Sequence, residues 1–211
     1  MSSENNETRL RILDATVESL VETRGRGAKM GEIAKAAGIS RQAVYLHFAS
    51  RSELLIAAFR HLGDSLDVKS RLAPSRAAKT GVERVERYIE FWGSYLPEIY
   101  GLAKALLIAQ ETDAAAADAW RDRMVAMRDG CRAAIDALLG DGMLADEWKR
   151  DEAIDAFMAL LQVSNWEYLT QECGWTNERY IERMKKLAER TFVSWPGQSD
   201  IPGPRTASPG H

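Results

Sequence analysis

The chain has 211 residues, of which 45% are hydrophobic, so it can bury a core as one large domain or as a small domain plus a larger one. Its net charge of −3 excludes a protein that is basic throughout. The two cysteines, Cys131 and Cys173, are too few and too far apart for a disulfide scaffold or a metal site, and we expect both to be small buried side chains. No apolar run reaches membrane-spanning length and the N-terminus does not have the form of a signal peptide, which predicts a cytoplasmic protein without membrane association.

Helical periodicity runs from about residue 7 to residue 193, and no segment alternates as a strand does, so the sequence predicts an all-α protein. Residues 1–6 are polar and expected to be frayed. The first expected helix follows, with Leu13, Thr16, Val17 and Leu20 on one face, and it ends at residues 24–27.

Residues 30–48 have the pattern of two short helices joined by a sharp turn. Gly38 stands where the first helix must end in a left-handed conformation, and Ser40 can cap the second helix. Val44 points back to lock the pair. Arg41, Gln42, Tyr45 and His47 remain on the outside, so this second helix is a candidate for entering a DNA groove.

Further helices are expected along the rest of the chain. Ser50 and Glu53 form a capping box that opens a helix to about residue 66, and residues 67–79, with Pro74, are expected to be a loop. Helices are then predicted over 80–96, from Pro97 to about 110, and over 113–139, 146–172 and 176–193. Residues 196–211 are rich in Pro, Gly and Ser and are predicted to be disordered.

The charge is unevenly distributed along the chain. Between Arg24 and Arg60, seven Lys and Arg side chains accompany two acids, whereas residues 61–211 hold 19 basic and 24 acidic residues. A basic front on an acidic body suits a protein that approaches DNA in one orientation, because phosphate attracts the front and repels the body.

The order of these parts resembles the TetR (tetracycline-repressor-like) transcriptional regulators. The resemblance covers about residues 7–59, and beyond this range only helix number and length agree. It is carried by Arg9, Ile12, Leu13, Ala15, Thr16, Ile33-Ala34, Ala37-Gly38-Ile39-Ser40, Val44-Tyr45, His47-Phe48 and Glu53-Leu54-Leu55.

The resemblance implies an N-terminal helix-turn-helix domain over residues 1–50, a larger helical ligand-binding and dimerisation domain over 51–195, and the tail over 196–211. It also implies a homodimer that pairs through its last two helices. Its two recognition helices would read a near-palindromic operator on double-stranded DNA, and a small molecule would release the protein from that DNA. We accordingly predict a ligand-responsive repressor with about nine helices.

Carried over residue by residue, the resemblance places Arg41, Gln42 and Ala43 at the groove and Tyr45 and His47 at phosphate or base edges. Arg51 would hold a phosphate. Met30 departs from the family pattern, which usually has Thr there, so Lys29 or a backbone amide becomes the expected anchor. The alternatives are a solvated face for Arg41 and Gln42, packing for Tyr45, and a helix-capping role for His47. The full predicted DNA-binding set is Lys29, Met30, Ser40, Arg41, Gln42, Ala43, Tyr45, His47 and Arg51.

Aromatic and Met side chains of the larger domain are candidates for lining a ligand cavity, together with a few polar groups. The alternative is an ordinary helical core. The predicted lining is Trp92, Tyr95, Gln110, Trp120, Met124, Met127, Phe157, Leu161, Asn165 and Trp166, which favours a small, largely apolar or aromatic effector.

The apolar faces of the last two expected helices are equally compatible with a dimer interface and with an intramolecular core. The competing functions are a ligand-independent DNA-binding regulator, a dimeric helical scaffold and an all-helical enzyme. We predict no catalytic residues, metal site or cofactor, because His47, His61 and His211 fit no metal or triad spacing.

Overall fold

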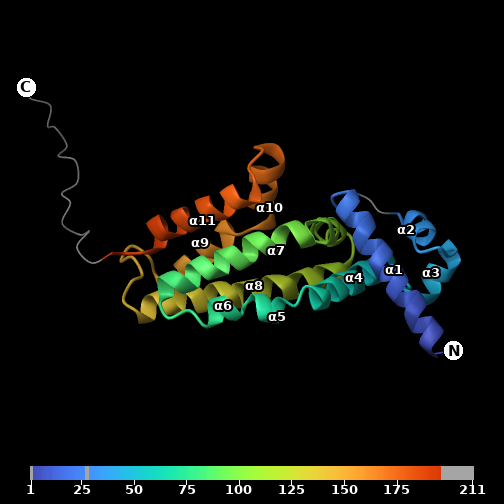
Figure 1. Ribbon diagram of the computed structural model, residues 1–211, viewed down its shortest axis with the longest axis horizontal. Coiled ribbons are helices and arrows are strands. Elements are labelled where there is room, and N and C mark those ends of the chain that lie inside the picture. The colour runs from blue at the N-terminus through green and yellow to red at the C-terminus, as the bar shows by residue number, and fades with distance from the viewer. Residues whose placement is uncertain (1, 27–28, 196–211) are drawn as a thin grey trace, which may run out of the picture.

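A computed structural model describes residues 2–26 and 29–195, and this part of the chain is built from helices. The only extended pairing among the described residues is an isolated bridge between Leu144 and Val193. Figure 1 shows an elongated molecule: the first three helices form one end, and the long helices of the body run side by side away from them. The predicted all-α class is thereby confirmed.

The N-terminal end consists of three helices packed around a small core. They are α1 (Ser2–Glu22), α2 (Met30–Ala36) and α3 (Arg41–His47). Leu13 and Thr16 of α1 are buried as expected, and the Thr16 hydroxyl donates a hydrogen bond to the Ile12 carbonyl oxygen, which satisfies it in the core. The expected start at residue 7 is wrong, because α1 begins at Ser2 and its polar first turns lie in solvent.

The segment after the helix-turn-helix contains α4 (Arg51–Ser65), α5 (Val68–Arg71) and α6 (Ala73–Arg76). The predicted loop over 67–79 is therefore wrong over most of its length. Asp67 caps α5 by accepting a hydrogen bond from the Ser70 amide. Pro74 lies in the first turn of α6, where a missing N–H costs no helical hydrogen bond.

Two long antiparallel helices, α7 (Gly81–Ala109) and α8 (Ala114–Gly140), form the centre of the body. The expected break at Pro97 does not occur: Pro97 lies inside α7, and its side chain is exposed while Leu96 and Ile99 on either side are buried. Packing of these neighbours outweighs the cost of one proline, about 3 kcal/mol. The predicted helix over 113–139 is confirmed.

The C-terminal part is divided more finely than the periodicity suggested. It comprises α9 (Arg150–Leu160), α10 (Val163–Glu167), the π-helical turn η1 (Tyr168–Glu172) and α11 (Asn177–Phe192). The single helix expected over 146–172 is wrong, because the extended backbone at Gln162 separates α9 from α10. Cys173 is exposed, contrary to expectation, whereas Cys131 is buried.

Most of the apolar residues expected on the last helices are buried in the core of the chain itself. α11 packs on α7 and α9, and Ile154, Phe157, Met184 and Phe192 are almost completely buried. These faces therefore belong to the intramolecular core. Across the described residues no helix is long and apolar enough to cross a membrane. The predicted disordered tail, with His211, lies outside the described residues.

Candidate DNA-binding surface and ligand cavity

The turn between α2 and α3 has the geometry that the sequence predicts. Gly38 adopts a φ of +69°, and the next amide, that of Ile39, donates to the Ala34 carbonyl oxygen. The Ser40 hydroxyl oxygen accepts a hydrogen bond from the Ala43 amide at 3.1 Å and caps α3. The turn therefore fixes the direction of α3 relative to α2.

α3 has a packed back and an open front. Val44 is completely buried, as is Phe48 at the C-terminal cap, whereas Arg41 and Gln42 are exposed. Tyr45 exposes 41% of its surface, and the Arg41 guanidinium lies 5.8 Å from the centre of its ring. The side chains predicted to read DNA thus lie free of the core on one helix.

The remaining predicted DNA contacts are placed less uniformly. Lys29 is exposed at the start of α2, and its amide donates to the Glu32 carboxylate. Met30 is 6% exposed, so its side chain packs in the core and only its backbone is near the surface. His47 and Ala43 are half-buried on α3, and Arg51 is half-buried in the first turn of α4.

One surface residue of α3 was not predicted. Leu46 exposes 84% of its surface, the highest value among the exposed large hydrophobic residues. It follows Gln42 by four residues, so both lie on one side of the helix. The helical spacing from Gln42 could have identified it.

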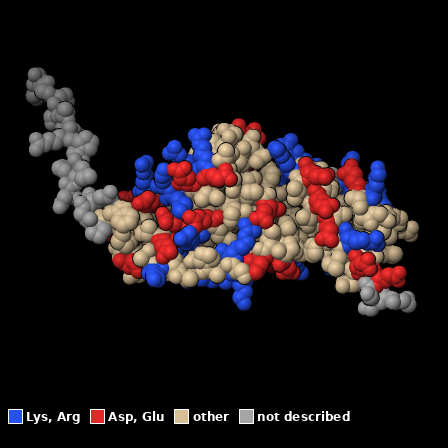
Figure 2. All heavy atoms as spheres, in the orientation of Figure 1, with Lys and Arg blue, Asp and Glu red and all other residues tan. Residues whose placement is uncertain are grey.

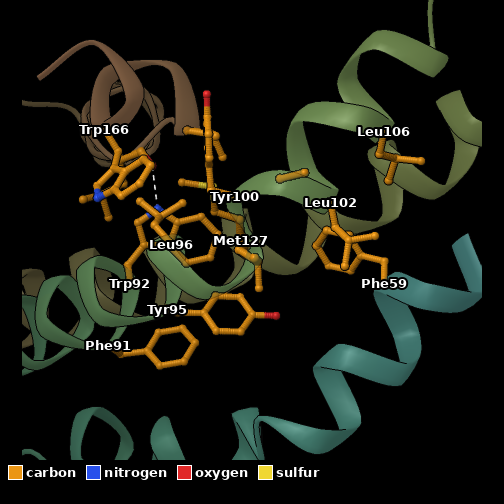
Figure 3. Close-up of a cluster of buried hydrophobic side chains, with 14 of the residues drawn as sticks. Phe59, Phe91, Trp92, Tyr95, Leu96, Tyr100, Leu102, Leu106, Met127 and Trp166 are labelled. Atoms are coloured by element: carbon orange, nitrogen blue, oxygen red, sulfur yellow. Dashed lines mark hydrogen bonds between the residues drawn. The ribbon is translucent and has the colours of Figure 1, made fainter. Parts of the chain in front are cut away.

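A cavity of about 560 Å³ lies in the body, bounded by α4, α5, α6, α7 and α8. Trp92, Tyr95, Trp120, Met124 and Met127 line it, as predicted. Figure 3 shows Tyr95 and Phe91 projecting from the same side of α7. Their rings stack with centroids 5.4 Å apart, so the wall is a continuous aromatic surface.

Five residues predicted to line the cavity lie elsewhere. Their positions in the fold are as follows. Phe157 packs on Tyr88 and Phe192, the Leu161 carbonyl accepts from Trp92 Nε1 at 2.6 Å, and Gln110 is the C-cap of α7. The Asn165 side-chain amide donates to the Ala159 carbonyl, and Trp166 Nε1 donates to Asn177 Oδ1 at 2.9 Å.

Residues 12–58 match the family model described as bacterial regulatory proteins, tetR family. The helix-turn-helix transcriptional regulator SrpR of Pseudomonas putida is 43% identical over 56 residues, which is 26% of each chain. The regulator AcrR of Shigella flexneri is 43% identical over 51 residues, 24% of each chain. Residues 12–58 are therefore similar to the N-terminal region of TetR-family regulators. The match spans about a quarter of the length of these relatives, so what the rest of a TetR-family chain does is not carried over by it.

Solved structures extend the similarity of fold beyond residues 12–58 to most of the chain. A regulator from Saccharomonospora viridis in complex with choline has a TM-score of 0.76 at 19% identity, covering 90% of this chain and all of that one. The regulator FadR of Bacillus subtilis in complex with stearoyl-CoA has a TM-score of 0.68 at 16% identity, covering 86% and 98%. At such identities the likeness establishes the fold alone.

Several lining residues come from elements that the sequence did not assign to the cavity. α4 contributes Phe59, Arg60, Gly63 and Asp64, and the expected loop contributes four more residues, from α5, α6 and the position between them. The helical spacing of Phe59 and Gly63 could have indicated a common face. Nothing in the sequence showed that α5 and α6 would cover it.

α1 also contacts the central helix directly. A Cβ atom on Gly101 of α7 would lie 2.2 Å from the Leu20 carbonyl oxygen of α1, so the two backbones meet where only glycine fits. Gly25, with a φ of +74°, similarly approaches Gly101 and Lys104. The N-terminal helices are thus held to the body by α1 as well as by α4.

No group of three or more His, Cys, Asp or Glu side chains that could hold a metal occurs within residues 2–26 and 29–195. Figure 2 shows basic and acidic side chains interleaved over one face of the body. Ion pairs such as Arg128 with Asp155 and Arg150 with Asp136 occur among the charged side chains of the body. The helix surfaces that carry such exposed ion pairs face solvent.

Proposed function

We propose that this chain is a transcriptional repressor that binds a near-palindromic DNA operator as a homodimer and is released by a small, largely apolar effector. The exposed front of α3 supports the first part. Arg can bind guanine through two hydrogen bonds and Gln can bind adenine likewise, so Arg41 and Gln42 have the chemistry of base readout in the major groove. Such a repressor would act in the cytoplasm, where bacterial DNA is found.

The observation that carries the proposal is the position of α4. It begins at Arg51, three residues after Phe48 caps α3, and eight residues later Phe59 enters the cavity wall. One continuous helix therefore joins the DNA-binding end to the ligand cavity. A ligand that favours one placement of α4 would shift the population of recognition-helix orientations, provided that it binds the two states with different affinities.

The choline and stearoyl-CoA bound by two proteins of this fold support a ligand-binding role for the body here. The cavity is mostly apolar and of the size of small-molecule sites. Release would follow if the occupied state separated the two recognition helices too far for successive major grooves.

A homodimer through the last two helices completes the proposal. The apolar sides of α9 and α11 pack against other helices of the same chain, so a dimer interface would use residues on their solvent-facing sides. Tyr168 of η1 and Leu187 of α11 expose 62% and 46% of their surfaces. The charged residues around them would form a polar rim, as in protein interfaces generally.

Selection from a random duplex DNA library tests the DNA-binding part. We expect enrichment of a near-palindrome with half-sites one helical turn apart, and affinity that falls steeply with salt. Arg41→Ala should lower the affinity, with Arg132→Ala, a body residue paired with Asp129, as the matched control. A library that emerges without any sequence preference would contradict a repressor and favour the dimeric scaffold.

Ligand response is tested separately, by measuring operator affinity with and without a compound that binds the cavity. A compound that binds tightly and leaves the operator affinity unchanged would exclude release by ligand and favour a ligand-independent regulator. The relatives in the N-terminal region are transcriptional regulators rather than enzymes, which agrees with the absence of a catalytic role from the proposal.

A further inference from the structure

The cavity wall contains an excess of arginines. Arg60, Arg76, Arg84 and Arg123 line it, against two acids, Asp64 and Asp129. Asp129 is already paired with Arg132 at 2.5 Å. Within the described part of the chain, no carboxylate lies within 4.0 Å of any of the four lining guanidinium groups, whereas many arginines elsewhere on the body are paired. Arginines without a carboxylate partner therefore line the cavity, Arg60 and Arg76 exposed and Arg84 and Arg123 half-buried.

Two of these arginines share one end of the cavity. Arg60 of α4 and Arg123 of α8 also border a smaller adjoining hollow of about 240 Å³, which places them together at a junction. One acid, Asp122, lines this hollow as well, so the two arginines outnumber it there. The Arg123 guanidinium lies 4.7 Å from the centre of the Phe59 ring. Contact with the ring covers one face of the planar guanidinium and leaves its N–H groups free to donate at the edge.

The Tyr95 hydroxyl adds a third donor near the same place. Tyr95 is 6% exposed, and among the described residues its hydroxyl has no hydrogen-bond partner. Burial raises the pKa of Tyr95, although the positive charges of Arg123 and Arg71 oppose this rise. The hydroxyl therefore stays protonated at neutral pH and can donate a hydrogen bond.

These three groups have the same requirement. Guanidinium groups only donate, so a cluster of Arg60, Arg123 and a protonated Tyr95 attracts a negatively charged acceptor most strongly. Arg60 is exposed and Arg123 is half-buried, so both can reach a ligand that enters the cavity. A ligand with an acid group would satisfy all three donors at once.

The rest of the cavity is long and apolar. Its lining on α7 extends from Arg84 to Ala103, 19 residues apart, which corresponds to about 28 Å of helix. Tyr88, Trp92 and Met127 lie between these ends. A volume of about 560 Å³ spread over this length is narrow, so it fits an elongated molecule better than a compact one.

We propose that the cavity binds an elongated anionic amphiphile, whose carboxylate or phosphate group pairs with Arg60, Arg123 and the Tyr95 hydroxyl while its apolar chain lies along Tyr88 and Met127. This inference deepens the proposed function by naming the chemical class of the effector. Aromatic rings can also hold a quaternary ammonium group, but the four unpaired arginines at this cavity repel a cation.

Four probes with the same ten-carbon chain test the charge preference: decanoate, decyl phosphate, decan-1-ol and decyltrimethylammonium. Each is titrated below its micellar concentration into the full chain without DNA, with binding followed by calorimetry. We expect one or both anions to bind about 10-fold or more tightly than the alcohol, and the cation to bind most weakly. Whichever anion binds more tightly assigns the acid group as carboxylate or phosphate.

Arg123→Gln tests the position of the acid group, with Arg121→Gln as a matched control on the same helix, because Arg121 is exposed and pairs with Asp118. We expect Arg123→Gln to weaken anion binding about 10- to 100-fold and to leave decan-1-ol binding unchanged, which also verifies that the variant is folded. Tyr95→Phe should weaken anion binding less.

The inference is overturned if the alcohol or the ammonium compound binds as tightly as both anions, or if Arg123→Gln loses no more anion affinity than Arg121→Gln. Because binding is measured without DNA, the result is independent of release. An anion that binds through Arg123 but leaves operator affinity unchanged would contradict the proposed function and uphold the assignment of the cavity.

Discussion

On α3, the neighbours of each side chain determine what it can contribute to DNA recognition. Arg41 lies close to the Tyr45 ring and the Ser40 hydroxyl caps the helix, so these two neighbouring polar residues have different roles. Gln42 and Leu46 remain free on the surface. A polar and an apolar side chain four residues apart can read adjacent base edges, including the methyl group of thymine.

Leu46→Ala should therefore reduce operator affinity by about 1 kcal/mol, close to the burial free energy of one or two methylene groups. Its thermal unfolding should be unchanged, because Leu46 is 84% exposed. Competition binding with operators that carry uracil in place of thymine identifies the contact. Equal losses for Leu46→Ala on both operators would show that the side chain contacts no thymine methyl group.

Arg41→Ala should cost about 1–3 kcal/mol on the selected operator and much less on random DNA. The two affinities are measured at the same salt concentration, because phosphate contacts change strongly with salt. An equal loss on both DNAs would place Arg41 at the phosphate backbone. In that case base reading would fall to other residues of α3.

At the scale of elements, the sequence predicts best where local signals determine structure. The turn between α2 and α3 follows from Gly38 and Ser40, and the cap of α4 follows from Ser50. The prediction fails at Pro97, because burial of neighbouring residues on both sides keeps the helix continuous despite a local breaking signal.

The cavity is only half predictable for a related reason. Periodicity identifies aromatic residues that face inward, but Tyr95 borders a cavity while Phe157, equally buried, fills the core between other rings. Whether a buried ring borders a cavity or fills the core depends on which helix packs against it. The residues that α4, α5 and α6 contribute to the cavity wall are brought there by tertiary packing, and no local sequence pattern encodes this placement.

The contact between α1 and α7 gives a prediction at this scale. Gly101→Ala would place a Cβ atom 2.2 Å from the Leu20 carbonyl oxygen, so the helices must separate. We expect a loss of about 1–3 kcal/mol in the free energy of unfolding, together with weaker operator binding. Gly140→Ala is the control, since no atom lies within 4 Å of its added Cβ. Denaturant unfolding of both variants measures the difference, and equal stabilities would show that α1 does not rest on α7.

A polar cluster joins α7 to α10 close to the same contact. Glu167 accepts hydrogen bonds from the Tyr100 hydroxyl at 2.6 Å and from Lys104 Nζ at 2.8 Å. Burial raises the pKa of Glu167, but the hydrogen bonds from Lys104 and Tyr100 outweigh it, and the pKa is lowered overall. The ionised carboxylate therefore stabilises the folded chain.

Glu167→Gln should cost about 1 kcal/mol of stability at pH 7. Because the folded pKa is the lower one, the contribution of Glu167 is complete above its unfolded pKa, about 4.3, and is lost as the pH falls through its folded pKa. The gap between wild type and variant should close over that acidic range. Urea unfolding from pH 3 to pH 7 measures it, and a gap independent of pH would mean that the charge contributes nothing.

At the scale of the whole molecule, charge and shape act together. The basic residues between Arg24 and Arg60 lie mainly in the end formed by α1, α2 and α3 and in adjoining α4, while the body carries the acidic excess. A single recognition helix of seven residues offers few base contacts, so specific binding depends on two copies held at a fixed spacing. In the proposed repressor, the oligomeric state would therefore control operator affinity.

Leu187→Asp tests this dependence, because Leu187 is the exposed apolar residue of α11. A charge at a dimer interface must be desolvated without a partner, so we expect the variant to become monomeric and to lose most of its affinity for the full operator. Its binding to a half-site should change little. Leu139→Asp, at 48% exposure on α8, is the matched control and should remain dimeric.

Light scattering after size-exclusion chromatography gives the mass of each variant. A monomeric Leu139→Asp beside a dimeric Leu187→Asp would place the interface at the end of α8 and remove α11 from it.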